Sequence, residues 1–207
     1  MGEGPLAKNK RDIDLKVKQD ELESTASRLF LSLGYDGTSM NRIARELGVA
    51  PNTLYWYYAS KDELLVGVLN RQMSQTLVRL PTIVDKPLKE KMDWALREFE
   101  QSRELAATVH ARLEQSDVIR EWHDQFHRFV EAAVIHTLQA DGVAREGAAM
   151  LAIVGTFLVE GLLAHPHSEI QREAILQWFT ESALPAYLGL FLEGEIENTE
   201  ASYACSP

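Results

Sequence analysis

Residues 38–65, TSMNRIARELGVAPNTLYWYYASKDELL, contain two short helical segments on either side of a glycine. The first segment is predicted to begin at Thr38 or Ser39, because a side-chain hydroxyl there can accept a hydrogen bond from a free backbone N–H group. Gly48 follows the segment directly, and glycine ends a helix at low cost because it tolerates a positive φ angle. The apolar side of the segment consists of Ile43, Ala44 and Leu47.

The second segment runs from about Pro51 to Tyr57. Proline lacks a backbone N–H, and this loss is tolerated in the first turn of a helix because that group has no helical partner there. The segment is predicted to bury Leu54 and to expose Asn52, Thr53 and Trp56. Two short helices joined by a glycine-containing turn form a helix-turn-helix, whose second helix contacts base edges.

These residues resemble the TetR family of bacterial transcriptional regulators, and the triplet Leu54-Tyr55-Trp56 is similar to the tetracycline-repressor branch. The matching residues are Thr38, Ile43, Ala44, Gly48, Val49, Thr53, Leu54, Tyr55, Tyr57, Lys61 and Leu64. The resemblance implies an all-α protein with an N-terminal three-helix DNA-binding domain that contains the helix-turn-helix. It also implies a C-terminal helical domain for ligand binding and dimerisation.

The resemblance further implies which residues contact DNA. Residues that match Thr38, Ser39, Tyr57 and Lys61 contact phosphates in the family, and those that match Asn41, Pro51, Asn52, Thr53 and Trp56 face or approach bases. Hydroxyls and a lysine satisfy phosphate oxygens, whereas an asparagine can pair with the edge of adenine. Tyr55 joins this set, although Tyr55 and Tyr58 can instead fill the seam between the DNA-binding domain and the next helix.

Composition and charge agree with a soluble globular protein. The chain has 207 residues, of which 45% are hydrophobic and 25% are charged. Residues 1–61 hold nine Lys/Arg and eight Asp/Glu, a net charge of +1, whereas residues 62–207 hold twelve and twenty-three, a net charge of −11. The acidic charge therefore lies away from the helix-turn-helix, which would orient the protein on a polyanion. The single cysteine, Cys205, and the polar stretch 1–19 predict a cytoplasmic protein without disulfides or a signal peptide.

The expected organisation has four parts. Residues 1–18 form a flexible tail, or a basic arm that contacts phosphate or the minor groove. Residues 19–66 form the DNA-binding domain, with a first helix from Gln19 to Leu33 that Gly34 ends. Residues 67–192 form the effector-binding and dimerisation domain, and residues 193–207 form a polar tail. Ser60 and Glu63 form a capping box that starts a long helix, and Pro81 ends it.

The stretch from Gly147 to Ala164 is apolar nearly all round, with Glu160 as its only charge. A stretch of this length could span a membrane, but Glu160 and the absence of basic flanking residues disfavour that interpretation. We expect instead a helix buried on every face. Paired with the last helix, from about Glu169 to Leu192 with a kink at Pro185, it would form a four-helix bundle across the two-fold axis of a homodimer. Packing within one chain is the alternative.

Aromatic and titratable residues on the C-terminal helices are candidates for an effector site. They are Trp94, Phe99, His110, Trp122, Phe126, His136, Phe157, Glu160 and Trp178, which lie on helices that the family arranges around its ligand cavity. Ordinary core packing is the alternative. An ionised Glu160 in an apolar helix must find a partner, either the effector or a histidine such as His136 or His110.

The pair His123 and His127 has the i, i+4 spacing of metal ligands. A third ligand at suitable spacing is missing, so a solvated helix face is favoured and no metal or cofactor is expected.

Taken together, the sequence features predict a homodimeric repressor that binds a palindromic operator in double-stranded DNA and is released by a small, largely apolar or aromatic effector. Two alternatives remain open, a DNA-binding adaptor without an effector and an enzyme with an ancillary helix-turn-helix. The enzyme is disfavoured because no catalytic set occurs at workable spacing.

Overall fold

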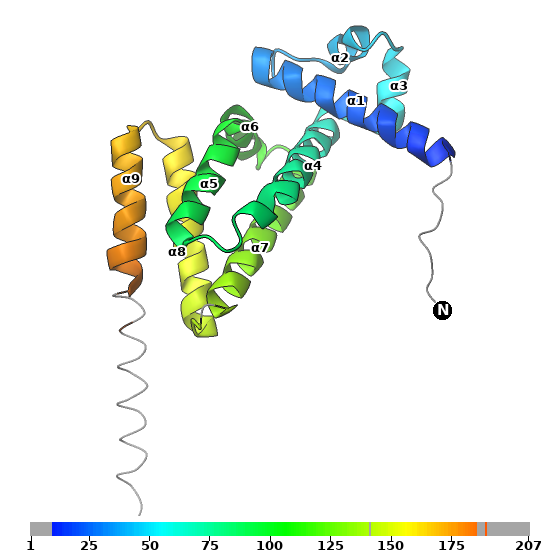
Figure 1. Cartoon of the computed structure of the whole chain (residues 1–207). Coiled ribbons are helices and arrows are strands. Elements are labelled where there is room, and N and C mark those ends of the chain that lie inside the picture. Colours follow the sequence, from blue (N-terminus) through cyan, green and yellow to red (C-terminus); the bar gives the residue numbers. More distant parts are fainter. Residues whose placement is uncertain (1–9, 141, 186–188, 190–207) are drawn as a thin grey trace, which may run out of the picture. The chain divides into compact units, whose positions relative to one another are not determined.

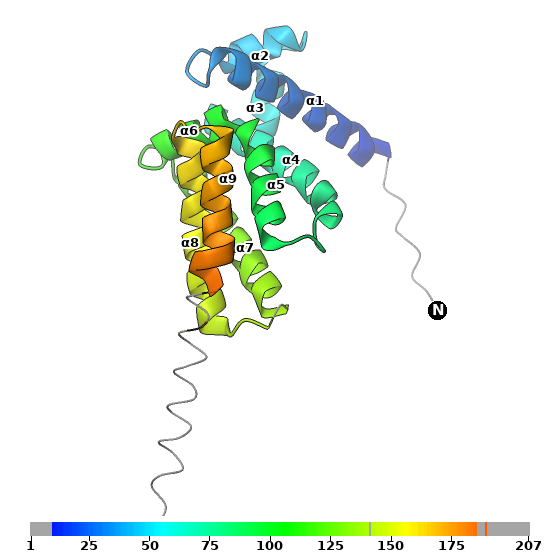
Figure 2. The same ribbon diagram turned by 60° about the vertical axis from the view of Figure 1, so that its left-hand side comes forward.

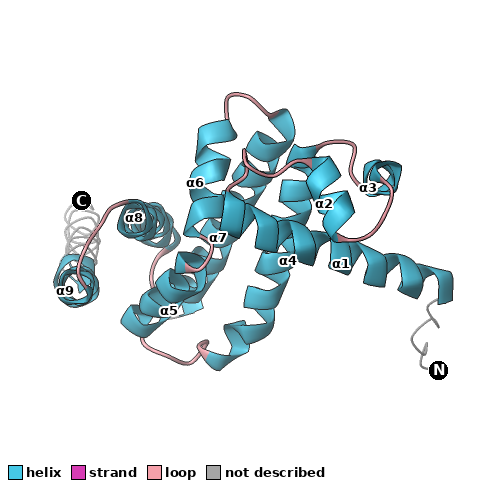
Figure 3. Ribbon diagram, turned by 90° about the horizontal axis from the view of Figure 1, so that it is seen from above, coloured by secondary structure: helices cyan, strands magenta, loops and turns pink. Residues whose placement is uncertain are grey.

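A computed structural model describes residues 10–140, 142–185 and 189. This part of the chain consists of helices and loops and contains no strand (Figure 3), so the predicted all-α class is confirmed. The chain forms two compact units, which are described separately below. The first unit consists of residues 1–81 and 104–123, and the second of residues 82–103 and 124–207.

The first unit contains α1 (Lys10–Leu33), α2 (Met40–Glu46), α3 (Pro51–Tyr57) and α4 (Lys61–Arg79) (Figure 1). It also contains nearly all of α6 (Arg103–Arg112) and the first turns of α7 (Asp117–Ala140). Its core includes Leu22, Phe30, Ile43, Leu54, Leu64, Val68, Leu105 and Ile119. Side chains from α4, α6 and α7 thus share one core with the helix-turn-helix, so this unit extends beyond the expected boundary between residues 66 and 67.

The local signals for helix ends act as predicted. Ser39 is the N-cap of α2, and its hydroxyl accepts a hydrogen bond of 3.2 Å from the backbone N–H of Arg42. Gly34 and Gly48 have φ angles of +75° and +66°, which lie in the left-handed region that favours glycine. The start of α1 differs from the prediction, because this helix begins at Lys10 rather than at Gln19. Residues 10–18 therefore belong to α1, and residues 1–9 lie outside the described part.

The cap of α4 differs in one detail from a complete capping box. Ser60 accepts a hydrogen bond of 3.1 Å from the backbone N–H of Glu63, as predicted. The carboxylate of Glu63, however, accepts from the backbone N–H of Ala59 at 2.8 Å, one residue before the cap. Both bonds satisfy backbone donors at the point where the helix-turn-helix is joined to the longer helix.

The second unit contains α5 (Leu88–Glu100), the rest of α7, α8 (Arg145–Ala164) and α9 (Glu169–Trp178). Helix α5 packs against α8 and α9 (Figure 2) through Met92, Leu96, Leu162, Leu176 and Phe179. A π-helical turn, Phe179–Ala183, follows α9 and precedes Pro185, where the sequence predicts a kink. Most of the remainder of the predicted last helix, residues 186–188 and 190–192, lies outside the described residues.

Helix α8 is not buried on every face within one chain, so this expectation is wrong for the monomer. Its buried residues are Gly147, Ala148, Leu151, Ala152 and Leu162. Met150, Ile153, Val154 and Phe157 are exposed, with 67% exposure at Phe157. The helix is long and apolar enough to cross a membrane by length and composition alone, and 28% of its apolar window is buried. Among residues 10–140, 142–185 and 189, nothing therefore covers this apolar face of α8.

Candidate nucleic-acid interface

One face of helix α3 is packed against the core of the first unit, and the opposite face is exposed to solvent. Leu54 is fully buried in the core of the first unit, which sets the rotation of this short helix. Pro51 and Asn52 are exposed, and Thr53 is half-buried. Tyr55 and Trp56 are 49% and 67% exposed, and the ring of Trp56 makes an edge-on contact with Tyr57 at a centroid distance of 4.7 Å. The helix thus presents both polar donors and aromatic area to solvent.

The expected contacts at the start of α2, Thr38, Ser39 and Asn41, lie in two different environments. Ser39 and Asn41 are exposed, and the Ser39 hydroxyl, which accepts the capping hydrogen bond from Arg42, keeps its own O–H as a donor for a ligand. Thr38 is fully buried, and its hydroxyl donates to the carbonyl oxygens of Gly34 and Leu29 at 2.9 and 3.2 Å. A phosphate contact by the Thr38 side chain is therefore contradicted, because the hydroxyl fastens the loop before α2 to the end of α1.

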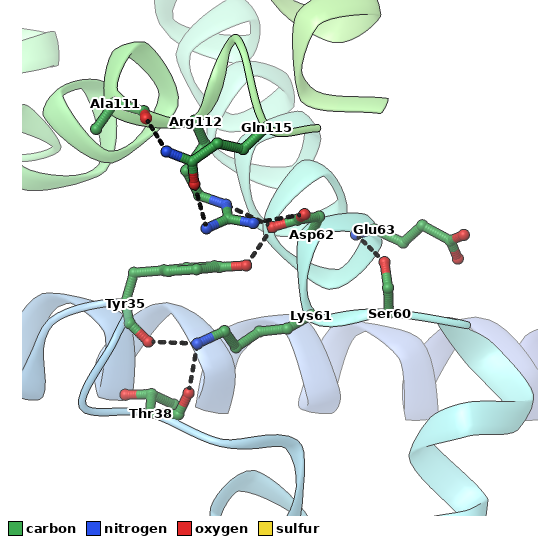
Figure 4. A network of polar contacts seen from close by, with 9 residues as sticks. All are labelled: Tyr35, Thr38, Ser60, Lys61, Asp62, Glu63, Ala111, Arg112 and Gln115. Atoms are coloured by element: carbon green, nitrogen blue, oxygen red, sulfur yellow. Dashed lines mark hydrogen bonds and ion pairs between the residues drawn. The ribbon is translucent and has the colours of Figure 1, made fainter. Parts of the chain in front are cut away.

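Lys61, expected to contact a phosphate, already binds backbone groups in this structure. Its Nζ donates to the carbonyl oxygens of Tyr35 and Thr38 at 2.9 and 3.0 Å and lies 3.8 Å from the centre of the Tyr35 ring (Figure 4). Burial lowers the pKa of this ammonium group below its ordinary value. Because an ammonium group has three N–H donors, one remains for a phosphate oxygen.

Next to Lys61, the carboxylate of Asp62 accepts hydrogen bonds from several side chains. Arg112 at the end of α6 donates two hydrogen bonds to it, of 2.8 and 2.9 Å, and the phenol of Tyr35 donates a third (Figure 4). Burial alone would raise the pKa of Asp62, but hydrogen bonds from Arg112, Tyr35 and Ser116 outweigh burial and hold the pKa below its ordinary value. Burial and the bond to Asp62 raise the pKa of Tyr35. No sequence pattern predicts this group, because its members lie far apart along the chain.

Tyr58 fills the seam between α1 and α4, in agreement with the alternative stated for Tyr55 and Tyr58. It is 7% exposed. Its hydroxyl donates to the buried carboxylate of Glu23 and accepts from the amide of Gln19 at 2.9 Å. Gly67 of α4 faces the same ring, since a Cβ there would lie 2.7 Å from the Tyr58 hydroxyl.

The comparison with protein families adds to this geometry. Residues 23–68 match the description "Bacterial regulatory proteins, tetR family". This N-terminal segment is thus similar to the DNA-binding domain of TetR-family regulators. The match begins within α1 and ends within α4, so it contains the whole helix-turn-helix. The resemblance recognised in residues 38–65 is thereby confirmed.

Relatives of the TetR-family domain agree with the assignment. The uncharacterized HTH-type transcriptional regulator YuxN of Bacillus subtilis (strain 168) is 35% identical over 72 residues, which are 35% of this chain and 25% of YuxN. An HTH-type transcriptional regulator of Staphylococcus aureus (strain USA300) is also 35% identical over 72 residues, which are 39% of that protein. The chain thus matches well under half the length of these relatives, which are named as regulators and not as enzymes.

Solved structures resemble the chain over most of its length. A transcriptional regulator from Rhodococcus sp. Rha1 has a TM-score of 0.60 at 17% identity, over 85% of this chain and 96% of that chain. A transcriptional regulator from Saccharomonospora viridis in complex with choline has a TM-score of 0.57 at 21% identity, over 81% of this chain and 97% of that chain. At such low identity, the likeness indicates a shared fold.

The nine expected ligand residues do not converge on one place. His110 and Trp122 belong to the first unit, where the indole N–H of Trp122 donates to Asn70 of α4 at 2.8 Å. Phe157 and Trp178 are 67% and 62% exposed, and His136 is exposed as well. In the second unit, a cavity of about 20 Å³, with room for one water molecule, is lined by seven residues, none of which is among the nine.

A smaller group within the second unit does come together. Phe99 and Phe126 make an edge-on contact at a centroid distance of 5.9 Å, and Phe126 contacts the ring of His127 at 5.7 Å. Nε2 of His127 lies 3.1 Å from the carboxylate of Glu160. The sequence named His136 or His110 as the histidine partner of Glu160, whereas the ion pair found in the second unit is with His127. The i, i+4 spacing of His123 and His127 singles out His127 on α7 but does not reveal a partner on another helix, and packing against α8 brings His127 to Glu160.

Proposed function

We propose that this chain is a homodimeric transcriptional repressor that binds a palindromic operator in the cytoplasm. The observation that carries this proposal is helix α3 of the TetR-family domain. Leu54 anchors α3 in the core, while Asn52 and Trp56 are presented to solvent. A rigid helix with exposed donors suits the major groove, where an asparagine can form two hydrogen bonds to adenine. One such helix touches too few groups to select a site, so two copies are needed.

Exposed apolar side chains on α8 and α9 support a dimer. Val154 and Phe157 on α8 are 42% and 67% exposed, and Ile170 and Trp178 on α9 are 82% and 62% exposed. Exposed aromatic and aliphatic side chains grouped on neighbouring helices are typical of subunit interfaces. A second copy of this chain is the occupant that we propose, because a two-fold axis places the same face on both partners.

The group Phe99, Phe126, His127 and Glu160 supports an effector site in the second unit. Its two phenyl rings offer apolar contact area, and the His127–Glu160 pair offers a hydrogen-bonding end on an otherwise apolar helix. A small, largely apolar or aromatic molecule with one polar group matches this combination. It would release the operator to the extent that it binds better to the form of the dimer that does not fit DNA.

The first experiment selects duplexes from a random-sequence library with the purified chain and measures binding by gel shift at fixed salt. We expect an enriched site with two-fold symmetry and half-sites separated by about one helical turn. Enrichment of no sequence over random duplex would contradict the DNA-binding part of the proposal. Sedimentation of the chain, alone and with the selected duplex, tests the dimer.

The second experiment tests the effector. Thermal denaturation is followed in the presence of a library of apolar and aromatic compounds, and hits are retested with Phe126→Ala and with the control variant Phe129→Ala. A ligand at 100 times its Kd stabilises by about 2.7 kcal/mol, which is easily detected. The proposal requires a hit that raises Tm, lowers affinity for the selected duplex and is lost in Phe126→Ala. Absence of such a compound favours the adaptor without an effector.

A further inference from the structure

The first and second units are joined covalently at three points, after residues 81, 103 and 123. One of these points is the start of α6, whose first residue, Arg103, belongs to the second unit and whose remaining residues belong to the first. The last residue of α6 is Arg112, which carries the two hydrogen bonds to Asp62. Any strain that enters the first unit along α6 therefore reaches the Arg112–Asp62 pair.

The same carboxylate leads on to the helix-turn-helix. Asp62 accepts a hydrogen bond from Tyr35, which lies in the loop between α1 and α2. The Tyr35 ring lies between the side chains of Arg112 and Lys61 (Figure 4), with the guanidinium 4.8 Å and the ammonium 3.8 Å from the ring centre. Lys61 also holds the carbonyl oxygen of Thr38, the residue before the N-cap of α2. The end of α6 is thus tied through side chains to the start of α2.

We propose that Arg112, Asp62 and Tyr35 form a positioning clamp through which α6 sets the position of the loop that starts the helix-turn-helix. Asp62 and Arg112 are 17% and 24% exposed, so solvent competes little for their hydrogen bonds. An arginine that binds a carboxylate through two parallel bonds has a fixed orientation, so a rotation of α6 moves the carboxylate with it or breaks both bonds. The clamp regulates DNA binding, and in this respect it rests on the proposed function.

Amide hydrogen exchange without DNA tests the clamp independently of that function. In Arg112→Ala we expect exchange to become faster, by about fivefold or more, in residues 35–43 as well as near residue 112. Tyr35→Phe keeps the ring and removes the hydroxyl, and it should accelerate exchange at the end of α6. The matched control is Arg97→Ala, which removes an exposed arginine paired with Asp93 in the second unit and should leave residues 35–43 unchanged.

Acceleration confined to the neighbours of residue 112 would overturn the clamp. If Arg112→Ala does not fold, Arg112→Lys replaces it, because lysine keeps the charge and loses the paired hydrogen bonds, and the same acceleration in residues 35–43 is required.

A second arm adds the duplex selected from the random library. It should slow exchange at residues 108–116 in the original chain and not in Arg112→Ala. If no duplex is selected, the proposed function fails while the DNA-free result still decides the clamp. If duplex binds and residues 35–43 do not respond to Arg112→Ala, the clamp fails while the function stands.

Discussion

Arg112 and Asp62 are fifty positions apart in the sequence, yet two hydrogen bonds of 2.8 and 2.9 Å join the guanidinium to the carboxylate. The pair ties α6 to the first turn of α4, within the core that also holds the helix-turn-helix. The low solvent exposure of both side chains and the additional hydrogen bond from Tyr35 to Asp62 strengthen this ion pair. We therefore expect the stability of the DNA-binding domain to depend on Arg112, which lies well outside the matched segment 23–68.

The acid stability of the protein should depend on Asp62. Its pKa in the folded state lies below its ordinary value of 3.8, so the ionised carboxylate contributes its full stabilisation above about pH 4 and loses it as the pH falls through the lower folded-state value. Asp62→Asn should lower the free energy of unfolding at pH 7 by about 1–3 kcal/mol and flatten its decline below pH 4. Urea denaturation at several pH values measures both effects. The control is Asp117→Asn, which changes a carboxylate that is 93% exposed. If the free energy of unfolding depends on pH in the same way in the original chain and in both variants, the prediction is refuted.

Two helical glycines should respond to alanine with opposite signs. At Gly67 a Cβ would lie 2.7 Å from the Tyr58 hydroxyl, and Glu23 and Gln19 hold that hydroxyl in place. Gly67→Ala should therefore destabilise the protein by about 1–3 kcal/mol. Gly161 in α8 has open space, so Gly161→Ala should stabilise by about 0.5–1 kcal/mol through helix propensity. Thermal denaturation measures the change in the free energy of unfolding for both variants. A change of the same sign in both would show that the Tyr58 ring moves away from the new methyl group.

Base contacts and phosphate contacts should differ in their salt dependence. Asn52→Ala and Thr53→Ala should each weaken binding to the selected site by about 1–3 kcal/mol per half-site, with little change for random duplex. Lys61→Ala should weaken binding to all sequences alike and reduce the slope of log Kd against log salt concentration by about 1. Gel shifts at four salt concentrations distinguish the two classes. Unchanged affinity in all three variants would contradict the assignment of α3.

Dimerisation should depend on the exposed face of α8. Phe157→Glu places a charge where we expect a partner subunit, and it should convert the dimer to a monomer at micromolar concentration. Phe129 on α7 is also exposed, at 46%, and Phe129→Glu should leave the dimer intact. Sedimentation velocity compares the two variants with the unaltered chain. A dimer that persists in Phe157→Glu would place the interface elsewhere.

Part of the candidate nucleic-acid interface could be predicted from the sequence alone. The exposure of Asn52 and Trp56 and the burial of Leu54 are set by helical periodicity, and all three agree with the prediction. The predicted effector residues do not form one site. A side chain on a helix can face solvent, the core or another helix, and helical periodicity does not determine which of these it faces. Trp122 and Phe157 illustrate this, since one packs in the core of the first unit and the other is exposed.

The sequence by itself determined the helix-turn-helix, because its signals act over a few residues. The hydroxyl of Ser39 can reach only the next turn, and the lack of a side chain lets Gly34 and Gly48 adopt the positive φ angles that end a helix. Only the tertiary structure decided that the Thr38 hydroxyl is buried and that Asp62 binds Arg112. The reason is that the burial of a hydroxyl and a hydrogen bond between distant residues both arise only when several helices pack together, and no local pattern encodes that arrangement.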